Sequence, residues 1–352
     1  MSSTIEVIAT GARTPLGLTA ETTAAAVRAA ISGFGEFPFI MASGEPVVTC
    51  ADTQLDSKLE GRERLVPMIE SALGEVMRKL SSGTPYRGTC YLLFALPEAR
   101  PGFSDDDTQW VKNTITSRLR APDWQVRAGV VGRGHAGTMQ AIHRVVQESA
   151  RGAEGLFLIV GADSYHHSET FIWLEQNRRF AQPTIRSGFI PGEGAGCLAL
   201  ATSQLRSHIG APTLAIVGGV GLAQETLLRD SETGSFGAGM IEAVLAATEG
   251  LQLPRDAVDT LYSDINGERY RSEEWGFVAM KTYALWKSLE YEAPGSNWGD
   301  IGAAFGTLAC VLAVQSYERG YARGPRTMVM AGSDSGTRGA MLLQDARGRR
   351  TS

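Results

Sequence analysis

The sequence predicts an α/β protein whose two halves share one architecture. Apolar strands alternate with amphipathic or alanine-rich helices along the chain, and this order begins again near residue 205. The 352 residues, 43% of them hydrophobic, suffice to bury a large core. The 41 glycines recur at expected strand–helix junctions, where the backbone turns tightly. This alternation is typical of parallel strands covered by helices.

The expected halves are residues 1–204 and 205–352. No linker rich in Pro, Gly or Ser separates them, so we expect the halves to pack as one body. Their similarity lies in the order of elements, because no residue-level repeat is evident.

The first half begins with a strand–helix unit. Residues 5–11 form a strand, and the alanine-rich helix after it has Thr19 as its expected N-cap and Gly33 as its expected stop. The apolar positions then predict a helix over 62–80, a buried strand over 88–98, a helix over 138–150, a buried strand over 155–164, and a glycine-rich turn and strand over 188–203.

The second half follows the same order. We expect strands over 213–221 and 258–267, helices over 237–251, 273–290 and 307–320, a glycine-rich segment over 293–306, and final strands over 326–332 and 339–345.

Charge and cysteine content exclude several classes of protein. The net charge of −5, without a block of like charges before the short tail ARGRRTS, gives no footprint for nucleic acid or an anionic membrane. No stretch matches a signal peptide or a membrane span, so we expect a cytoplasmic protein. The cysteines are scattered without a CxxC pair, which disfavours disulfides and zinc and indicates inert core residues: Cys50, Cys90, Cys197 and Cys310.

His135 occupies an unusual position. The segment VVGRGHAGTMQAIHRVV, residues 130–146, predicts the end of a strand, a glycine-flanked turn and an amphipathic helix. A side chain at that junction sits on a sharp turn above the first N–H groups of the helix, where several folds place a nucleophile. Histidine is an unexpected residue for that place.

Several motifs, taken in order, resemble the β-ketoacyl synthase family. GFIPGEGAGCLAL resembles the family's GFV-x-GEGAG-x-LVLE, and IEVIATGARTPLG resembles its opening V-V-I-T-G-x-G-x-x-T-P-x-G. LFLIVGADS, GSNWGDIGAAFG and SGTRGAMLL resemble three further segments. The resemblance implies a thiolase fold, in which two similar halves form a five-layer αβαβα sandwich with a pocket between them.

The same resemblance implies that the condensing site is altered. Members of the family acylate a cysteine at a helix N-terminus and use two histidines for decarboxylation and enolate stabilisation. Those three positions fall on His135, Asn266 and Asp300, and Gly295 replaces the family's lysine. The terminal G-F-G-G loop falls on Ser333–Gly336, SDSG, without the gating phenylalanine.

Two functions remain open. An acyl-imidazole on His135 would hydrolyse readily and a carboxylate at Asp300 would repel an enolate, which favours a non-condensing protein that acts through binding. The alternative is an acyltransferase or thioesterase in which Asp300 orients His135 as a general base and Asn266 polarises the carbonyl of an acyl thioester.

Other residues are weaker candidates. Trp275 and Trp298 flank the Asn266 and Asp300 loops and, with Ser333 and Gly336, are candidate substrate-binding residues, although core packing explains the tryptophans equally well. His166 and His167 are adjacent on a loop and are not expected to bind a metal together. Arg178 and Arg179 could meet an acidic carrier protein or a phosphate, but an exposed helix face is the default interpretation.

The resemblance also implies partners. We expect a homodimer, or a heterodimer with an active ketosynthase as in chain-length factors, with the strand GLFLIVGA, residues 155–162, near the interface. An acyl carrier protein is a possible further partner, whereas no cofactor is implied. A role in an unrelated system, such as delivery of a secreted protein, is a third possibility that no residue supports.

Overall fold

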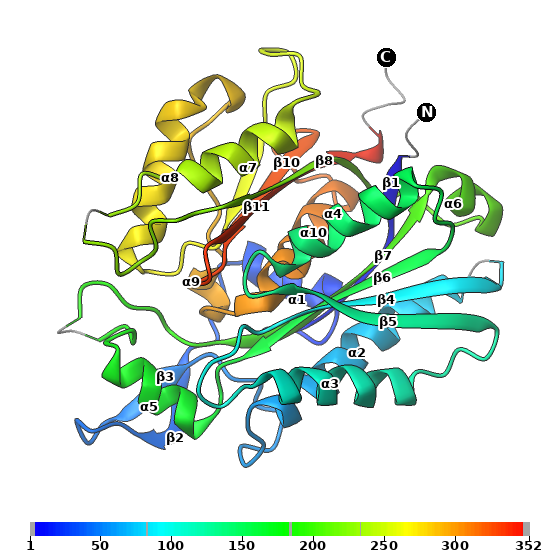
Figure 1. Ribbon diagram of the computed structural model, residues 1–352. Helices are drawn as coiled ribbons and strands as arrows, with labels where there is room; N and C mark the ends of the chain where they lie inside the picture. Colours follow the sequence, from blue (N-terminus) through cyan, green and yellow to red (C-terminus); the bar gives the residue numbers. More distant parts are fainter. Residues whose placement is uncertain (1–3, 82–83, 183–184, 233, 348–352) are drawn as a thin grey trace.

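A large mixed sheet forms the centre of the protein. The computed structural model describes residues 4–81, 84–182, 185–232 and 234–347 (Figure 1). In the described residues nine strands pair in the order β5 (Trp124–Arg133), β4 (Gly88–Leu96), β6 (Leu156–Ser164), β7 (Glu193–Thr202), β1 (Ile5–Arg13), β8 (Ala215–Gln224), β11 (Thr337–Asp345), β10 (Arg326–Gly332) and β9 (Thr260–Ser263).

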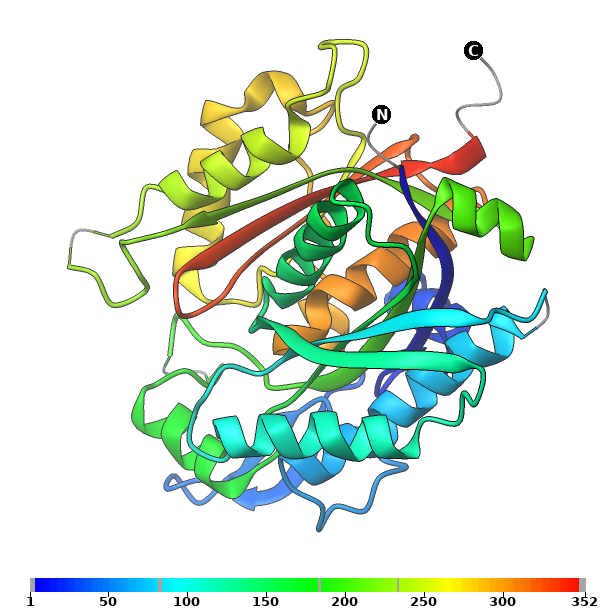
Figure 2. The ribbon, with the colours of Figure 1, turned by 45° about the vertical axis from the view of Figure 1, so that its right-hand side comes forward.

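The two halves of the chain form the two parts of this sheet, and helices separate and cover them. In the described residues the sheet pairing between the parts is that of Glu6 and Val7 of β1 with Ile216 and Ala215 of β8. Helices α4 (Gly137–Ala150) and α10 (Phe305–Glu318) lie between the parts (Figures 1 and 2). The outer faces are covered by α2 (Arg62–Leu80) and α3 (Asp105–Arg118) on one part, and by α7 (Ala238–Thr248) and α8 (Arg269–Lys281) on the other.

Three apolar clusters correspond to these layers. The central cluster includes Ile142 of α4 and Leu308 of α10, which face both parts of the sheet. A second cluster lies between the first part and α2, and a third lies between the second part and α7 and α8. The architecture is the thiolase-type α/β fold, and the predicted boundary at 204/205 falls inside α6 (Ser203–Ile209).

The sheet is mixed, which corrects the expectation of parallel strands. Strand β4 runs parallel to β5 and β6, and β9 runs parallel to β10. Strands β7, β1, β8 and β11 pair antiparallel with their neighbours. Strands β10 and β11 pair antiparallel because the short turn Ser333–Gly336 between them reverses the chain.

Strand β6 is interior, which corrects its expected place near an interface. Residues 155–162 fall almost entirely within β6, which pairs with β4 on one side and β7 on the other. In the described part of the chain β5 is the edge strand of this half. A partner that pairs with the sheet here would therefore meet β5.

Most expected elements are present, although several boundaries differ, including both ends of β9 and the ends of α1, α7 and α8. Thr19 caps α1 (Ala20–Arg28) with a capping box, but the helix ends before Gly33, because Ala29 is its C-cap and Ala30 has a φ of 54°. Helix α8 ends at Lys281, and the predicted continuation to 290 is a 3-10 turn, Tyr283–Leu285, followed by extended chain. Elements that the sequence did not predict are β2 (Gly35–Ile40), β3 (Pro46–Thr49), α3, α5 (Ser168–Gln176) and α6.

All four cysteines are buried and free, as expected for core residues. Burial raises the pKa of the Cys50 and Cys90 thiols to about 12. Among the described residues no helix has the length and apolar character required to cross a membrane.

Candidate functional site

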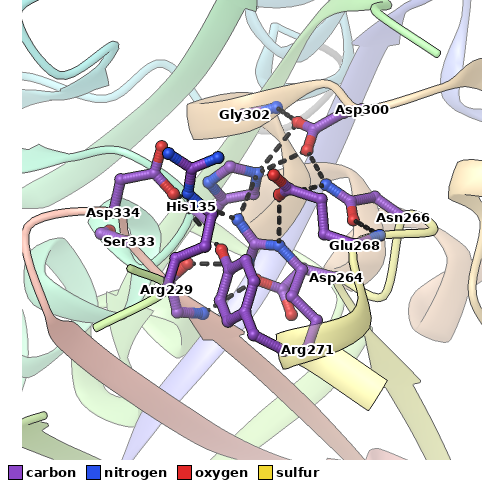
Figure 3. Close-up of polar contacts among 12 residues, drawn as sticks. His135, Arg229, Asp264, Asn266, Glu268, Arg271, Asp300, Gly302, Ser333 and Asp334 are labelled. Carbon is purple, nitrogen blue, oxygen red and sulfur yellow. Dashed lines mark hydrogen bonds and ion pairs between the residues drawn. The ribbon is translucent and has the colours of Figure 1, made fainter. Parts of the chain in front are cut away.

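The three residues that the resemblance assigns to the condensing site meet at one point in the structure. His135 lies between the end of β5 and the start of α4, Asn266 follows β9, and Asp300 lies between α9 (Gly295–Trp298) and α10. The Nε2 atom of His135 is 2.9 Å and 3.1 Å from the two carboxylate oxygens of Asp300 (Figure 3). The Nδ2 atom of Asn266 donates to the same carboxylate. The contact between His135 and Asp300 joins the first half of the chain to the second.

The Asp300 carboxylate is saturated with hydrogen bonds. Tyr165 donates its hydroxyl at 3.1 Å and Gly302 its backbone N–H at 2.8 Å, in addition to His135 and Asn266. Burial alone would raise the pKa of Asp300, but the charge and hydrogen bond of His135, the charge of Arg271 and the amide of Asn266 outweigh burial. The pKa is therefore held well below its ordinary range, and Asp300 is a carboxylate.

The surroundings of His135 favour its protonated form. The residue is 5% exposed, and burial alone would lower its pKa. The Asp300 carboxylate more than compensates, although Arg271, with Nη2 3.5 Å from Nε2 of His135, opposes it. The net result is a raised pKa, which favours the imidazolium at neutral pH. Because Nε2 faces the ionised carboxylate, this nitrogen carries a proton and has no free lone pair.

A second group of charges surrounds this pair and also joins the halves. Arg179, in the first half, donates to both oxygens of Glu268 at 2.8 Å and 3.0 Å, and to Asp334 at 2.6 Å. Arg271 forms an ion pair with Asp264 and donates to the carbonyl of Gly332 at 2.8 Å. Desolvation would lower the pKa of Arg179, but Asp334 and Glu268 raise it above its ordinary value.

The burial of Arg179 overturns the default interpretation of this segment as an exposed helix face. Arg179 is 3% exposed, whereas Arg178 is exposed. Helix α5 ends at Gln176, and Arg178 has a φ of 54°, so the chain turns and directs the next side chain inward. No local pattern predicts this burial, because the carboxylates that bind Arg179 lie in the other half.

Ser333 is part of the site, and Gly336 closes the adjoining turn. The Ser333 hydroxyl accepts a hydrogen bond from the Ala136 N–H at the start of α4 and donates to the Arg133 carbonyl, both at 3.0 Å. The Gly336 N–H donates to the Ser333 carbonyl at 3.0 Å, and its φ of 97° suits glycine.

Trp275 and Trp298, the other two candidate substrate-binding residues, lie in the core. Trp275 packs against Trp286, with ring centroids 5.2 Å apart, beneath α7. Trp298 is 0% exposed in the central cluster. Neither is among the described residues that line the cavity beside His135.

This cavity, of about 490 Å³, has walls that are mostly charged or aromatic. Its described lining includes Glu98, Arg100, Asp105, Arg133, His135, Asp163, Tyr165, Trp173, Arg179 and Asp334. The charges are paired across the wall: Arg100 lies 2.6 Å from Asp163 and its guanidinium stacks 4.2 Å from the Tyr165 ring centroid.

The histidines after β6 make separate contacts. His166 is buried with Nδ1 3.3 Å from Glu193 and Nε2 3.1 Å from Thr49. His167 caps α5 by accepting the N–H of Glu169 at 3.1 Å. No cluster of three or more His, Cys, Asp or Glu side chains with a metal-binding arrangement occurs in the described part of the chain.

Glu193, in the GEGAG motif, is a further buried charge that the motif comparison left without a role. Arg64 donates to both of its oxygens, at 2.7 Å and 2.6 Å. Burial would raise the pKa of Glu193, but His166 and Arg64 hold it well below its ordinary range. The signal was present in the sequence, because a glutamate inside a buried glycine-rich strand requires a partner.

Comparisons with known proteins bear on the fold alone. No protein-family model and no curated protein sequence matches the chain. Among solved structures, the ishigamide ketosynthase/chain length factor superposes with a TM-score of 0.76 at 15% identity, covering 98% of this chain and 100% of that chain. A ketosynthase–carrier protein complex, AntDE:AntF, described as a type II PKS acyl-carrier protein with its ketosynthase bound to the hexaketide, gives 0.77 at 13% identity, with 98% and 100% covered.

The ketosynthase ApeO in complex with its chain length factor ApeC, from Xenorhabdus doucetiae, gives a TM-score of 0.72 at 15% identity, with 98% of each chain covered. These likenesses extend over nearly the whole chain and agree with the layers and the strand order described above. The chain therefore has the fold of the ketosynthases and their chain length factors.

Proposed function

We propose that this protein is a non-condensing member of the ketosynthase fold that acts by binding, as a chain-length-factor-like subunit or as an adaptor for another protein. The observation that carries the proposal is the buried His135–Asp300 ion pair, which lies where the family resemblance places the acylated cysteine and a catalytic histidine. A structural ion pair there leaves no nucleophile for a condensing cycle.

The chemistry of the pair supports this function. An imidazolium has no lone pair with which to attack a thioester, and an acyl-imidazole would hydrolyse too readily to store an acyl group. The ionised Asp300 would repel an enolate at the position where a histidine should stabilise it. All four cysteines are buried in the core, so none replaces the missing thiolate.

The surroundings of the pair support it as well. The Ser333 hydroxyl already accepts a hydrogen bond from the Ala136 N–H. This N–H is one of the donors at the start of α4 that have no partner within the helix, and it could otherwise bind a developing oxyanion. Charged side chains that line the cavity beside His135 are paired with one another, as Arg100 is with Asp163.

Association through β5 would supply the binding role. In the described residues β5 pairs with β4 alone, and a ten-residue edge strand presents unpaired N–H and C=O groups to a second sheet. Two of the similar structures are described as ketosynthase and chain length factor assemblies. We therefore propose an active ketosynthase as the partner and a second copy of this chain as the substitute when that partner is absent.

A hydrolase or acyltransferase is the second candidate, and one observation favours it. His135, Asn266 and Asp300 converge as that mechanism requires, and His135 forms part of the wall of a cavity. The mechanism needs a neutral imidazole, which the raised pKa of His135 disfavours.

Turnover decides between the two functions. The purified protein and its His135→Ala variant would be offered acyl and malonyl thioesters, both free and on an acyl carrier protein, beside an active ketosynthase as positive control. We expect neither decarboxylation nor acyl transfer from either protein. Turnover by the native protein that disappears in the variant would establish the hydrolase or acyltransferase instead.

A further inference from the structure

Helix α7 is apolar on its outer face as well as on the face that packs against the sheet. Its sequence, AGMIEAVLAAT, contains a single charged residue, Glu242. The inner face, which includes Met240 and Val244, belongs to the third apolar cluster. On the outer face Ile241 is half-buried and Leu245 is 50% exposed. A helix that is apolar on all sides is ordinarily buried on all sides, so the outer face of α7 lacks a cover in the described chain.

Helix α8 extends this apolar surface. Phe236, just before α7, is 59% exposed and packs edge to face against Phe277 of α8, with ring centroids 5.3 Å apart. Met280 and Lys281 follow Phe277 by three and four residues, so the three side chains lie on one side of α8. Met280 is 64% exposed. Figures 1 and 2 show α7 and α8 together on the outer side of the second part of the sheet. Large apolar side chains gathered on a surface in this way mark an interaction site.

A groove of about 610 Å³ on this surface carries charges of both signs. We call its described lining the α7 face: Ala238, Ile241, Glu242, Leu245, Ala246, Glu249 and Lys281. Glu242, Glu249 and Lys281 are exposed, and none of them forms an ion pair with a residue that the structure describes. The α7 face therefore presents an apolar strip accompanied by unpaired carboxylates and an unpaired ammonium group.

We propose that the α7 face binds the same face of a second copy of this chain about a two-fold axis, with the two α7 helices antiparallel. Two-fold symmetry places one surface against itself, so that surface must be complementary to itself. Ile241 of each copy then packs against Leu245 of the other. Lys281 of each copy meets the carboxylates of the other, Glu242 and Glu249. Unpaired charges of both signs fit this arrangement, whereas a partner with one sign of charge would oppose like charges.

This contact is independent of the proposed function. Strand β5 is the edge of the first part of the sheet, whereas α7 packs on β8 and β11 of the second part. Association through the α7 face leaves β5 free for a ketosynthase, so both contacts can form in one assembly.

Sedimentation equilibrium of the full chain tests the proposal in a Gly129→Arg background, which blocks association through β5. We expect a dimer that dissociates on dilution. Leu245→Glu places a carboxylate in the apolar strip and should weaken the dimer by about tenfold or more, as expected for a central interface residue. Leu18→Glu, at a leucine of the first half that is 40% exposed, is the matched control and should leave the dimer unchanged. A monomer at every concentration, or equal effects of the two substitutions, would overturn the proposal.

Charge reversal in the same background tests whether the partner is a second copy. Lys281→Glu makes every charge on the α7 face negative, and Glu242→Lys combined with Glu249→Lys makes every charge positive. All three side chains are exposed, so both variants should fold, which circular dichroism verifies. Each variant alone should be monomeric because like charges then face each other, whereas an equimolar mixture should form a dimer. A mixture that stays monomeric, or a variant that dimerises alone as tightly as the unreversed chain, would overturn the pairing of two α7 faces.

Discussion

Arg179 and Glu268 form a two-pronged ion pair between the two halves of the chain. The Nε and Nη2 atoms of Arg179 lie 2.8 Å and 3.0 Å from the two carboxylate oxygens of Glu268, and both residues are nearly completely buried. Together with His135–Asp300, this pair fixes the halves beside the cavity. The position that the ketosynthase resemblance assigns to catalysis is thus occupied by charges that stabilise the docking of the halves.

Removing Arg179 should destabilise the protein strongly. Arg179→Leu leaves the buried Glu268 carboxylate without its main cation, and breaking a buried pair in this way costs about 3–5 kcal/mol. The free energy of unfolding, measured by urea denaturation, should fall by that amount. The exposed neighbour gives the control, since Arg178→Leu should change it by about 0.5 kcal/mol or less. Equal effects of the two substitutions would contradict the structure.

The contribution of His135 should depend on pH. Because the pKa of His135 is raised in the folded protein, folding is stabilised by proton binding below the unfolded pKa of about 6.5, and this stabilisation is lost as pH rises through the folded pKa. The lowered pKa of Asp300 has the opposite pH dependence. The ionised Asp300 stabilises the folded protein above about pH 4, and this stabilisation is lost on further acidification.

The stability difference between the native protein and His135→Gln should therefore be largest between about pH 4 and 6.5 and shrink above that range. Urea denaturation across the pH range measures it, with His208→Gln at the exposed end of α6 as control. A difference that grows toward alkaline pH would mean that His135 is buried as the neutral base.

Ser333 should contribute to stability through the start of α4. Ser333→Ala leaves the buried Ala136 N–H without its partner, which costs about 1–3 kcal/mol. Ser335→Ala, two residues along the same turn, removes an exposed hydroxyl and should cost little. Thermal denaturation of both variants checks this, and equal melting temperatures would show that water replaces the Ser333 hydroxyl.

Association should depend on the free edge of β5. A side chain built at Gly129 has no atom within 4 Å, so Gly129→Arg is compatible with the fold and places a bulky charge beside the edge. We expect it to weaken dimer formation in analytical ultracentrifugation. Gly35→Arg, at a position equally open, should leave the sedimentation unchanged. Unaltered association of the Gly129 variant would place the interface elsewhere.

Helices, strands and caps that depend on neighbouring residues could be predicted from the sequence. The apolar spacing of residues 62–80 predicted α2 with both ends correct, and Thr19 was correctly predicted as the N-cap of α1, with its capping partner only three residues away. His135 was recognised because a strand, a turn and a helix are contiguous there. The meeting of His135 with Asp300 followed only from the family resemblance.

The partners of the buried charged residues and the free edge of the sheet depend on tertiary packing. Arg179 is separated from Glu268 by 89 residues and from Asp334 by 155, so no window of sequence contains both members of either pair. The burial of the two tryptophans and the free edge of β5 were equally beyond local patterns. In each case the burial of a side chain and the identity of its partners are set when the two halves pack together. That packing brings together segments that are far apart in the sequence.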